Sequence, residues 1–147
     1  MKKALVTGGA GFIGSHLVDQ LINMGINVTI IDNLSTGKKE NINPKAKFIE
    51  CDISIASYID LTSYLNDIDI IFHLAAKTTV QESIENPILY NNINVKGTLK
   101  LLEVASAMKV KRFIFSSSSS VYGNAKIPTT EQHKLNPISP YALNKLI

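Results

Sequence analysis

The chain has 147 residues, of which 45% are hydrophobic, and this length supports one buried core while excluding two ordinary domains. Its formal net charge of +3 comes from lysines spread along the sequence, a pattern that argues against nucleic acid and favours small-molecule partners. A lone cysteine, Cys51, excludes a disulfide framework and fits a reducing, cytoplasmic setting, and no apolar run approaches the roughly 18 residues of a membrane span.

Short apolar runs alternate with segments of helical periodicity along the whole chain. This alternation is typical of βαβ units and predicts an α/β fold with a parallel sheet. The last four strands lack a clean polar alternation, so we expect both of their faces to be covered. The predicted strands are residues 3–7, 27–32, 47–51, 69–74 and 112–117.

Between the first and fifth strands, three segments are predicted to be helices: residues 12–24, 55–66 and 86–108. Gly25 follows the first as a stop signal, and Pro87 stands near the start of the third, where a missing N–H costs little. The apolar side chains that we expect to face inward are Phe12, Ile13, Leu17, Leu21 and Ile22 in the first helix, and Ile93, Leu99, Leu102 and Val104 in the third.

A glycine-rich turn joins the first strand to the first helix. Gly8 permits the tight turn, Gly11 lets the backbone approach a diphosphate, and Gly14 lets the helix pack close to the strand. The free N–H groups and the positive end of the helix dipole then face the phosphates. With a strand before it and a helix after it, the turn predicts a dinucleotide-binding Rossmann domain.

An acidic residue closes the second strand. Asp32 stands where a carboxylate can accept hydrogen bonds from an adenosine ribose. Its negative charge would repel a 2′-phosphate, so NAD is favoured over NADP. Lys38 and Lys39 lie nearby and keep NADP as the alternative.

Five motifs in order make the sequence recognisable. They are Thr7–Gly14 (TGGAGFIG), Asp32–Gly37 (DNLSTG), His73–Ala76 (HLAA), Ser116–Gly123 (SSSSSVYG) and Ser139–Lys145 (SPYALNK). Together they resemble the extended short-chain dehydrogenase/reductase superfamily, in its NAD-dependent nucleotide-sugar epimerase/dehydratase branch. This resemblance covers the whole chain. It implies a Rossmann-type, doubly wound parallel sheet over residues 1–147, without the substrate domain that follows the catalytic helix in the family.

The resemblance also implies which residues hold the cofactor. The glycine turn would bind the diphosphate, the loop after Asp32 the ribose, and the segments after the third and fourth strands the adenine and the remaining cofactor. For His73, a packed and hydrogen-bonded imidazole is favoured over a metal ligand. The implied cofactor-binding residues are Gly8, Gly11, Phe12, Ile13, Gly14, Asp32, Asn33, Ser35, Thr36, Gly37, Asp52, Ile53, Leu74, Ala75, Ala76, Asn94, Ser116, Tyr141 and Lys145.

The catalytic group implied by the resemblance is Ser118, Tyr141 and Lys145. Residues four apart on a helix share a face, so Tyr141 and Lys145 would lie together. An ammonium group beside a phenol favours the phenolate form, which can accept the proton of a sugar hydroxyl. Ser118 would hydrogen-bond the same oxygen. The last helix opens near Ser139 and Pro140 with about two turns, which is marginal without packing.

Loop chemistry narrows the expected reaction. Dehydratases of this branch carry an Asp-Glu pair where the present chain has Ser119 and Ser120. Without these carboxylates the simpler reaction is 4-epimerisation of a UDP-sugar, with UDP-glucose as the default substrate and other UDP-sugars left open. The segment from Thr78 to Ser83 departs from the family pattern, and Lys77 stands where glutamine is common.

Alternative functions remain open on the sequence alone. The chain stops at Ile147, about half the length usual in the family. It could therefore be an isolated NAD-binding fragment with little catalysis, a dehydratase or reductase of the same branch, or a relative that senses NAD and acts through partners. For the full-length form we expect a cytoplasmic homodimer that binds neither membranes nor nucleic acid. The fifth strand is expected to present an open edge.

Overall fold

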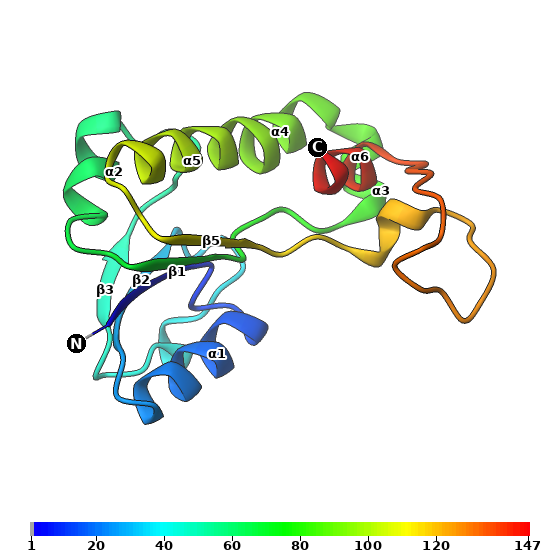
Figure 1. Ribbon diagram of the computed structural model, residues 1–147. Helices are drawn as coiled ribbons and strands as arrows, with labels where there is room; N and C mark the ends of the chain where they lie inside the picture. The colour runs from blue at the N-terminus through cyan, green and yellow to red at the C-terminus, as the bar shows by residue number, and fades with distance from the viewer. Residues whose placement is uncertain (1) are drawn as a thin grey trace.

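The central feature of the computed structural model, which describes residues 2–147, is a sheet of five parallel strands. The strand order is β3-β2-β1-β4-β5, so the direction of winding reverses between β1 and β4 (Figure 1). This order confirms the predicted Rossmann-type fold. The strands are β1 (Lys3–Thr7), β2 (Asn27–Asp32), β3 (Lys47–Glu50), β4 (Ile70–His73) and β5 (Arg112–Phe115).

Helices cover both faces of this sheet. Figure 1 shows α1 on one side and α2, α4 and α5 on the other. No helix within residues 2–147 is long and apolar enough to cross a membrane. The helices are α1 (Phe12–Asn23), α2 (Tyr58–Tyr64), α3 (Val80–Glu85), α4 (Pro87–Asn91), α5 (Gly97–Ala107) and α6 (Pro140–Leu146), with a π-helical turn at Asn92–Lys96 and 3₁₀ turns at Lys39–Asn41 and Ser119–Tyr122.

The helix predicted over residues 86–108 is confirmed as one continuous helical stretch over residues 87–107, but it is not regular throughout. It consists of α4, the π-helical turn and α5, and it is preceded by α3, which the sequence did not predict. Asn86 separates α3 from α4 with φ −130° and ψ 57°, since a residue before proline avoids the helical conformation. The predicted strands and the remaining helices are confirmed to within three residues at each end.

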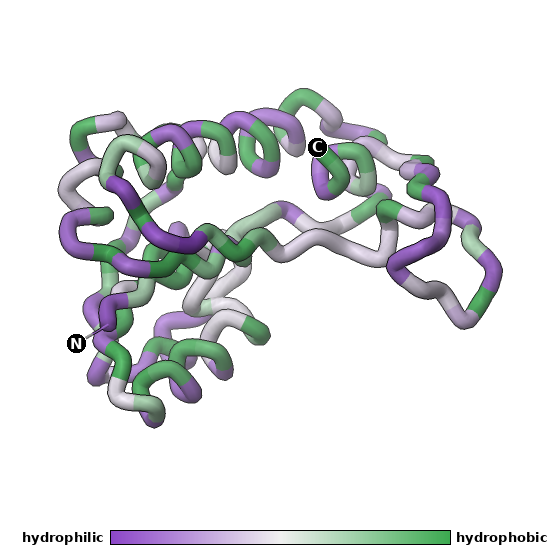
Figure 2. Tube along the Cα trace, viewed as in Figure 1, coloured by the Kyte–Doolittle hydropathy of each residue, from purple (hydrophilic) through white to green (hydrophobic). Residues whose placement is uncertain are grey.

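Two hydrophobic clusters fill the space between the sheet and its helices. On the α1 side, Val6 packs with Val18. On the other side, Leu5 packs with Leu101 and Val104. Neighbouring strand residues point to opposite faces, so β1 contributes to both clusters. The strands of the central sheet are accordingly mostly hydrophobic in Figure 2.

Several apolar residues that were expected to face the core are exposed. Phe12 is 80% and Ile13 65% exposed, because the first turn of α1 lies at the rim of a cleft rather than over the sheet. Leu99 and Leu102 are 57% and 38% exposed, because the sheet-facing side of α5 carries Leu101 instead. The spacing of apolar residues locates a helix, but it does not show whether those apolar side chains face the core or the solvent.

The edge strands are less covered than expected. Residues of β2 are mostly buried, whereas β3 and β5 contain no fully buried residue. Among the described residues β5 pairs only with β4, as predicted, and its Ile114 is exposed. The expectation that all four later strands are covered on both faces is therefore wrong for β3 and β5.

Candidate functional site

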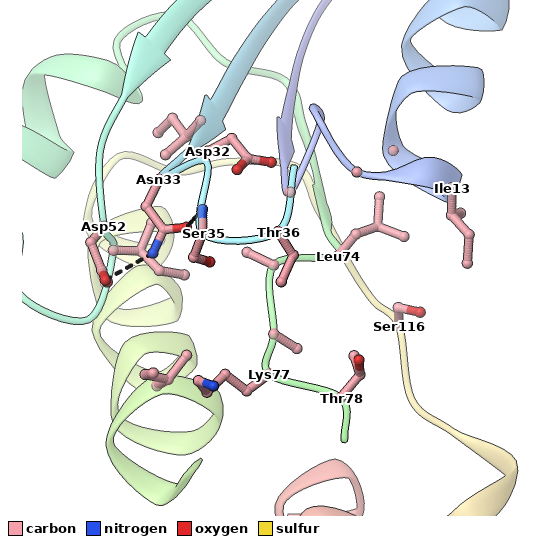
Figure 3. Close-up of a pocket in the computed structure, with 18 of the residues that line it drawn as sticks. Ile13, Asp32, Asn33, Ser35, Thr36, Asp52, Leu74, Lys77, Thr78 and Ser116 are labelled. Carbon is pink, nitrogen blue, oxygen red and sulfur yellow. Dashed lines mark hydrogen bonds between the residues drawn. The ribbon is translucent and has the colours of Figure 1, made fainter. Parts of the chain in front are cut away.

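A cleft of about 590 Å³ opens at the carboxyl ends of the strands, beside the point between β1 and β4 where the winding reverses (Figure 3). Ligands of open α/β sheets bind at such a switch point. Seventeen of the predicted site residues line this cleft. They are Gly8, Gly11, Phe12, Ile13, Gly14, Asp32, Asn33, Ser35, Thr36, Asp52, Ile53, Leu74, Ala75, Ala76, Ser116, Tyr141 and Lys145.

The glycine turn is closed so tightly that side chains are excluded from it. A Cβ on Gly14 would lie 2.1 Å from the carbonyl oxygen of Gly8. Gly8 itself has φ +72°, and a Cβ there would lie 2.8 Å from the amide nitrogen of Ala75. Glycine is therefore required at both positions, and the backbone that lines the cleft remains bare.

The N-terminus of α1 adds unpaired N–H groups to this bare surface. Gly11 is the N-cap residue, and within residues 2–147 no side chain caps this helix end. The contrast is with α2 and α6, where the hydroxyls of Ser57 and Ser139 accept a backbone N–H. A helix end that is left open toward a cleft is suited to a phosphate group.

Asp32 ties the glycine turn to the loop that follows β2. Its buried carboxylate accepts the N–H of Ala10 at 3.0 Å on Oδ2 and the N–H of Leu34 at 2.8 Å on Oδ1. Each carboxylate oxygen has further lone pairs, so these bonds leave Asp32 able to accept a ribose hydroxyl. Asp32 thus also has a structural role, since it holds the glycine turn and the loop after β2 together.

The loops that follow β2 and β3 are joined to each other on one side of the cleft. Asn33 donates from Nδ2 to Oδ2 of Asp52 at 3.0 Å (Figure 3). Ser54 donates its N–H and its hydroxyl to the other oxygen of Asp52, at 2.9 and 2.6 Å. Burial alone would raise the pKa of Asp52, but these hydrogen bonds and the charge of Lys100 outweigh it and hold the pKa below its ordinary value.

These features fit a dinucleotide. The bare turn and open helix end suit a diphosphate, Asp32 suits a ribose, and the cleft volume lies in the range of ordinary cofactor sites.

Three predicted site residues do not line the cleft. Gly37 packs beneath it, where a Cβ would lie 2.9 Å from the Cβ of Ala10. Asn94 is buried, and its side chain pairs with the backbone of Lys77. Ser118 accepts the N–H of Ser120 at 3.2 Å, which leaves its own hydroxyl proton free to donate.

The cleft also has lining residues that sequence reasoning missed. Lys77 and Thr78 extend from the turn after β4 (Figure 3). Lys77 forms an ion pair with Glu82 of α3, and Glu82 also accepts the hydroxyl of the buried Tyr90 at 2.9 Å. The departure of residues 77–83 from the family pattern was the only signal of this wall. The other missed lining residues are Ile31, Cys51, Ile93 and Ser117.

Helix α6 carries Tyr141 and Lys145 into the cleft. Its N-terminus is fixed by the N–H of Tyr141, which donates to the hydroxyl of Ser83 in α3 at 3.2 Å. Its other end is fixed to the β5 side, where Lys145 donates from Nζ to the carbonyl of Ser116 at 2.9 Å and Ser117 donates to the Lys145 carbonyl at 2.8 Å. Both side chains are buried.

Burial of Lys145 changes its acid–base behaviour. Desolvation lowers the pKa of Lys145 to about 8. Its ammonium group also lies 4.7 Å from the centre of the Phe115 ring, a favourable cation–π distance. A buried lysine whose pKa lies near neutrality is typical of a functional site.

His73 lies behind the cleft, at the end of β4. Its two ring nitrogens lie 2.6 Å from Oγ1 of Thr7 and 2.8 Å from Oγ1 of Thr98, so the predicted packed, hydrogen-bonded imidazole is confirmed. Among residues 2–147, no group of three or more potential metal ligands is gathered.

Comparison with known proteins agrees with this geometry. The sequence profile of the NAD dependent epimerase/dehydratase family matches residues 4–147. The curated putative UDP-glucose 4-epimerase of Methanocaldococcus jannaschii is 46% identical over 147 residues, which cover 97% of this chain and 47% of that protein.

Solved structures show the same similarity. UDP-glucose 4-epimerase from Thermotoga maritima with UDP-glucose is 44% identical with a TM-score of 0.92, over 98% of this chain and 48% of that one. UDP-N-acetylglucosamine 4-epimerase from Methanobrevibacter ruminantium, in complex with UDP-N-acetylmuramic acid, is 46% identical with a TM-score of 0.90, over 99% and 47%. The chain spans about half the length of these relatives.

Proposed function

Because the chain belongs to the NAD dependent epimerase/dehydratase family, we propose that it forms the cofactor-binding and catalytic half of a UDP-sugar 4-epimerase. The observation that carries this proposal is the convergence of the bare glycine turn, Asp32, Tyr141 and Lys145 on a single cleft. In this proposal residues 1–147 form one NAD-binding Rossmann domain.

The cofactor would lie along the carboxyl edge of the sheet. Backbone N–H groups at Gly11–Gly14 would bind the diphosphate, and Asp32 would accept a ribose hydroxyl. Asn33 and Asp52, already joined to each other, would form the adenosine end of the site. The negative charge of Asp32 favours NAD over NADP.

The reacting end of the site is formed by α6 and the end of β5. When bound, NAD supplies the oxidation and reduction at carbon 4 of the sugar. Tyr141 would accept the proton of the C4 hydroxyl and return it later, and Ser118 would donate a hydrogen bond to the same oxygen. The Lys145 ammonium favours the charged form of a neighbouring phenol and is held by the Ser116 carbonyl.

The loop after β5 favours epimerisation over dehydration. Removing water from a sugar needs an additional acid and base, and Ser119 and Ser120 supply no carboxylate there. The named substrates of the similar proteins are UDP-hexoses with and without an N-acetyl group. We therefore propose a UDP-sugar as the substrate class, with UDP-glucose and UDP-galactose as the first pair to assay.

The direct test is conversion of UDP-galactose to UDP-glucose by the purified chain with added NAD, followed by chromatography. We expect Tyr141→Phe to abolish turnover and leave the Kd for NAD unchanged, because this substitution removes only the hydroxyl group. Full turnover by Tyr141→Phe would refute the assignment of the proton acceptor.

The length comparison favours a second candidate, a cofactor-binding module with little catalysis. The chain matches only about half of its relatives, so groups that hold the sugar could lie outside residues 1–147. NAD binding without turnover in this assay would support the second candidate, whereas efficient turnover would exclude it.

We also propose that the complete protein is a cytoplasmic homodimer that binds no nucleic acid. Exposed apolar side chains on α4 and α5, among them Ile88, Leu99 and Leu102, offer a surface for a second copy. The single free thiol, Cys51, is compatible with a reducing compartment. The lysines are spread along the sequence rather than gathered in blocks, a pattern that argues against a nucleic-acid partner.

A further inference from the structure

A chain of hydrogen bonds runs behind the cleft and is not used by the chemistry described above. It begins at the N–H of Ala75, which donates to Oγ1 of Thr7 at 3.2 Å. Thr7 contacts Nδ1 of His73 at 2.6 Å, and Nε2 of His73 contacts Oγ1 of Thr98 at 2.8 Å. Thr98 in turn donates its hydroxyl to the carbonyl of Asn94 at 2.6 Å.

The direction of every bond in this chain follows from its last member. A hydroxyl has one proton, and Thr98 gives it to Asn94, so Thr98 can only accept from His73. The proton of a neutral His73 ring must then be on Nε2. Nδ1 is left as an acceptor for the Thr7 hydroxyl, whose oxygen accepts the N–H of Ala75.

This series of hydrogen bonds reaches the wall of the cleft formed by residues 75–77 at two places. Ala75 and Lys77 both line the cleft. Ala75 is bonded through Thr7, while the side chain of Asn94 accepts the N–H of Lys77 and donates to its carbonyl, both at 2.9 Å. The wall segment is thus held at one end through β1 and at the other through the π-helical turn.

We propose that His73 is a positioning residue, fixed as the neutral Nε2–H tautomer, that holds the Ala75–Lys77 wall in the shape that receives the cofactor. The residue touches neither the cleft nor substrate and acts through Thr7 and Thr98. Burial lowers the pKa of His73 to about 3, and the nearby positive charge of Lys145 acts in the same direction, so the ring stays neutral at physiological pH. The effect of His73 on cofactor binding rests on the proposed cofactor site, whereas the assignment of its tautomer does not.

The tautomer can be read directly from ¹⁵N shifts of the imidazole in the labelled, ligand-free chain. We expect a protonated Nε2 and an unprotonated Nδ1 between pH 5 and 8, with no titration. Protonation at Nδ1, or a charged ring in this range, would overturn the proposal. Neither reading depends on NAD binding.

The effect on the wall is tested with three variants. Thr98→Val removes the acceptor of the His73 proton and keeps the side-chain shape, while Thr98→Ser restores the hydroxyl. Thr62→Val is the matched control, since Thr62 makes the same hydroxyl bond to the carbonyl four residues back, in α2 and away from the cleft.

For Thr98→Val we expect the amide protons of Ala75 and Lys77 to exchange at least about tenfold faster and the Kd for NAD to rise about five- to tenfold. Thr98→Ser should restore both, and Thr62→Val should change neither. Unchanged exchange in Thr98→Val would overturn the proposal. A third outcome is faster amide exchange in Thr98→Val while no form of the chain binds NAD. This outcome would refute the proposed cofactor site and, with it, the role of His73 in NAD binding. The assignment of the His73 tautomer would still stand.

Discussion

At the scale of single residues, Gly14 sets the shape of the glycine turn. A methyl group at this position would overlap the carbonyl of Gly8, at 2.1 Å, so the turn and α1 cannot keep their present distance. We expect Gly14→Ala to raise the Kd for NAD at least about 100-fold, a loss of roughly 2.7 kcal/mol, measured by calorimetry.

The control for this prediction is another glycine with a different role. Gly25 has φ +75° at the C-terminal end of α1, with open space around its Cβ position. Gly25→Ala should cost about 1 kcal/mol of stability through backbone strain and leave NAD affinity intact. Equal effects of the two substitutions on affinity would show that helix stability, not the turn, controls binding.

Burial of the charged Lys145 side chain lowers the stability of the folded chain, and this effect can be measured. Its pKa of about 8 in the folded chain lies below the ordinary value of 10.5, so the unfolded chain binds more protons between these values. The free energy of unfolding therefore gains up to about 1.4 kcal/mol per pH unit across this window as pH rises. At pH 7 the buried charge destabilises the fold.

We predict that Lys145→Met is more stable than the parent at pH 7 by about 1–2 kcal/mol and that this advantage shrinks toward pH 10. Urea unfolding at the two pH values measures it, with the exposed Lys96→Met as the control. If the stability difference between Lys145→Met and the parent increased with pH, the prediction that Lys145 is buried in its charged form would be contradicted.

At the scale of elements, the short helix α6 depends on its ends. It spans seven residues, too few to be stable alone, and the hydroxyl of Ser139 caps it by accepting the N–H of Ala142 at 3.1 Å. We expect Ser139→Ala to cost about 1 kcal/mol locally, and to raise amide exchange in residues 141–145 and lower kcat more than NAD affinity.

Ser57 provides a matched comparison, because its hydroxyl caps α2 in the same way, at 3.1 Å from the N–H of Asp60. Ser57→Ala should cost a similar amount of stability without changing exchange in α6. If both variants altered α6 equally, the cap of α6 would have no specific role in presenting Tyr141.

The elements that the sequence predicted are those set by local patterns. Apolar runs located the five strands, and Gly25 located the end of α1, where the N–H groups of Gly25 and Ile26 bond back to Ile22 and Leu21. Helix α3 was missed because its residues lack a continuous apolar stripe and its packing partner, α6, lies more than 50 residues away in the chain.

The candidate site was predictable where a residue type has one physical explanation. Glycines that exclude a Cβ fall in this group. The pairing of Asn94 with Lys77, and of Ser83 with Tyr141, could not be read from sequence, because each depends on a contact between distant segments.

At the scale of the whole molecule, the fold brings the bare glycine turn, Asp32, Tyr141 and Lys145 to one edge of the sheet. The cleft lies beside the crossing from β1 to β4. The uncapped N-terminus of α1 lines one side of it, and α6 lies on the other side (Figure 1). Each part is anchored by its own buried contacts. The central claim is that this cleft is built for NAD.

The most direct test of that claim is calorimetric titration of the 147-residue chain with NAD and, separately, with NADP. We predict binding of one NAD per chain and at least about tenfold weaker binding of NADP, because the buried carboxylate of Asp32 repels a 2′-phosphate. Absence of NAD binding by the folded chain, or a preference for NADP, would contradict the account.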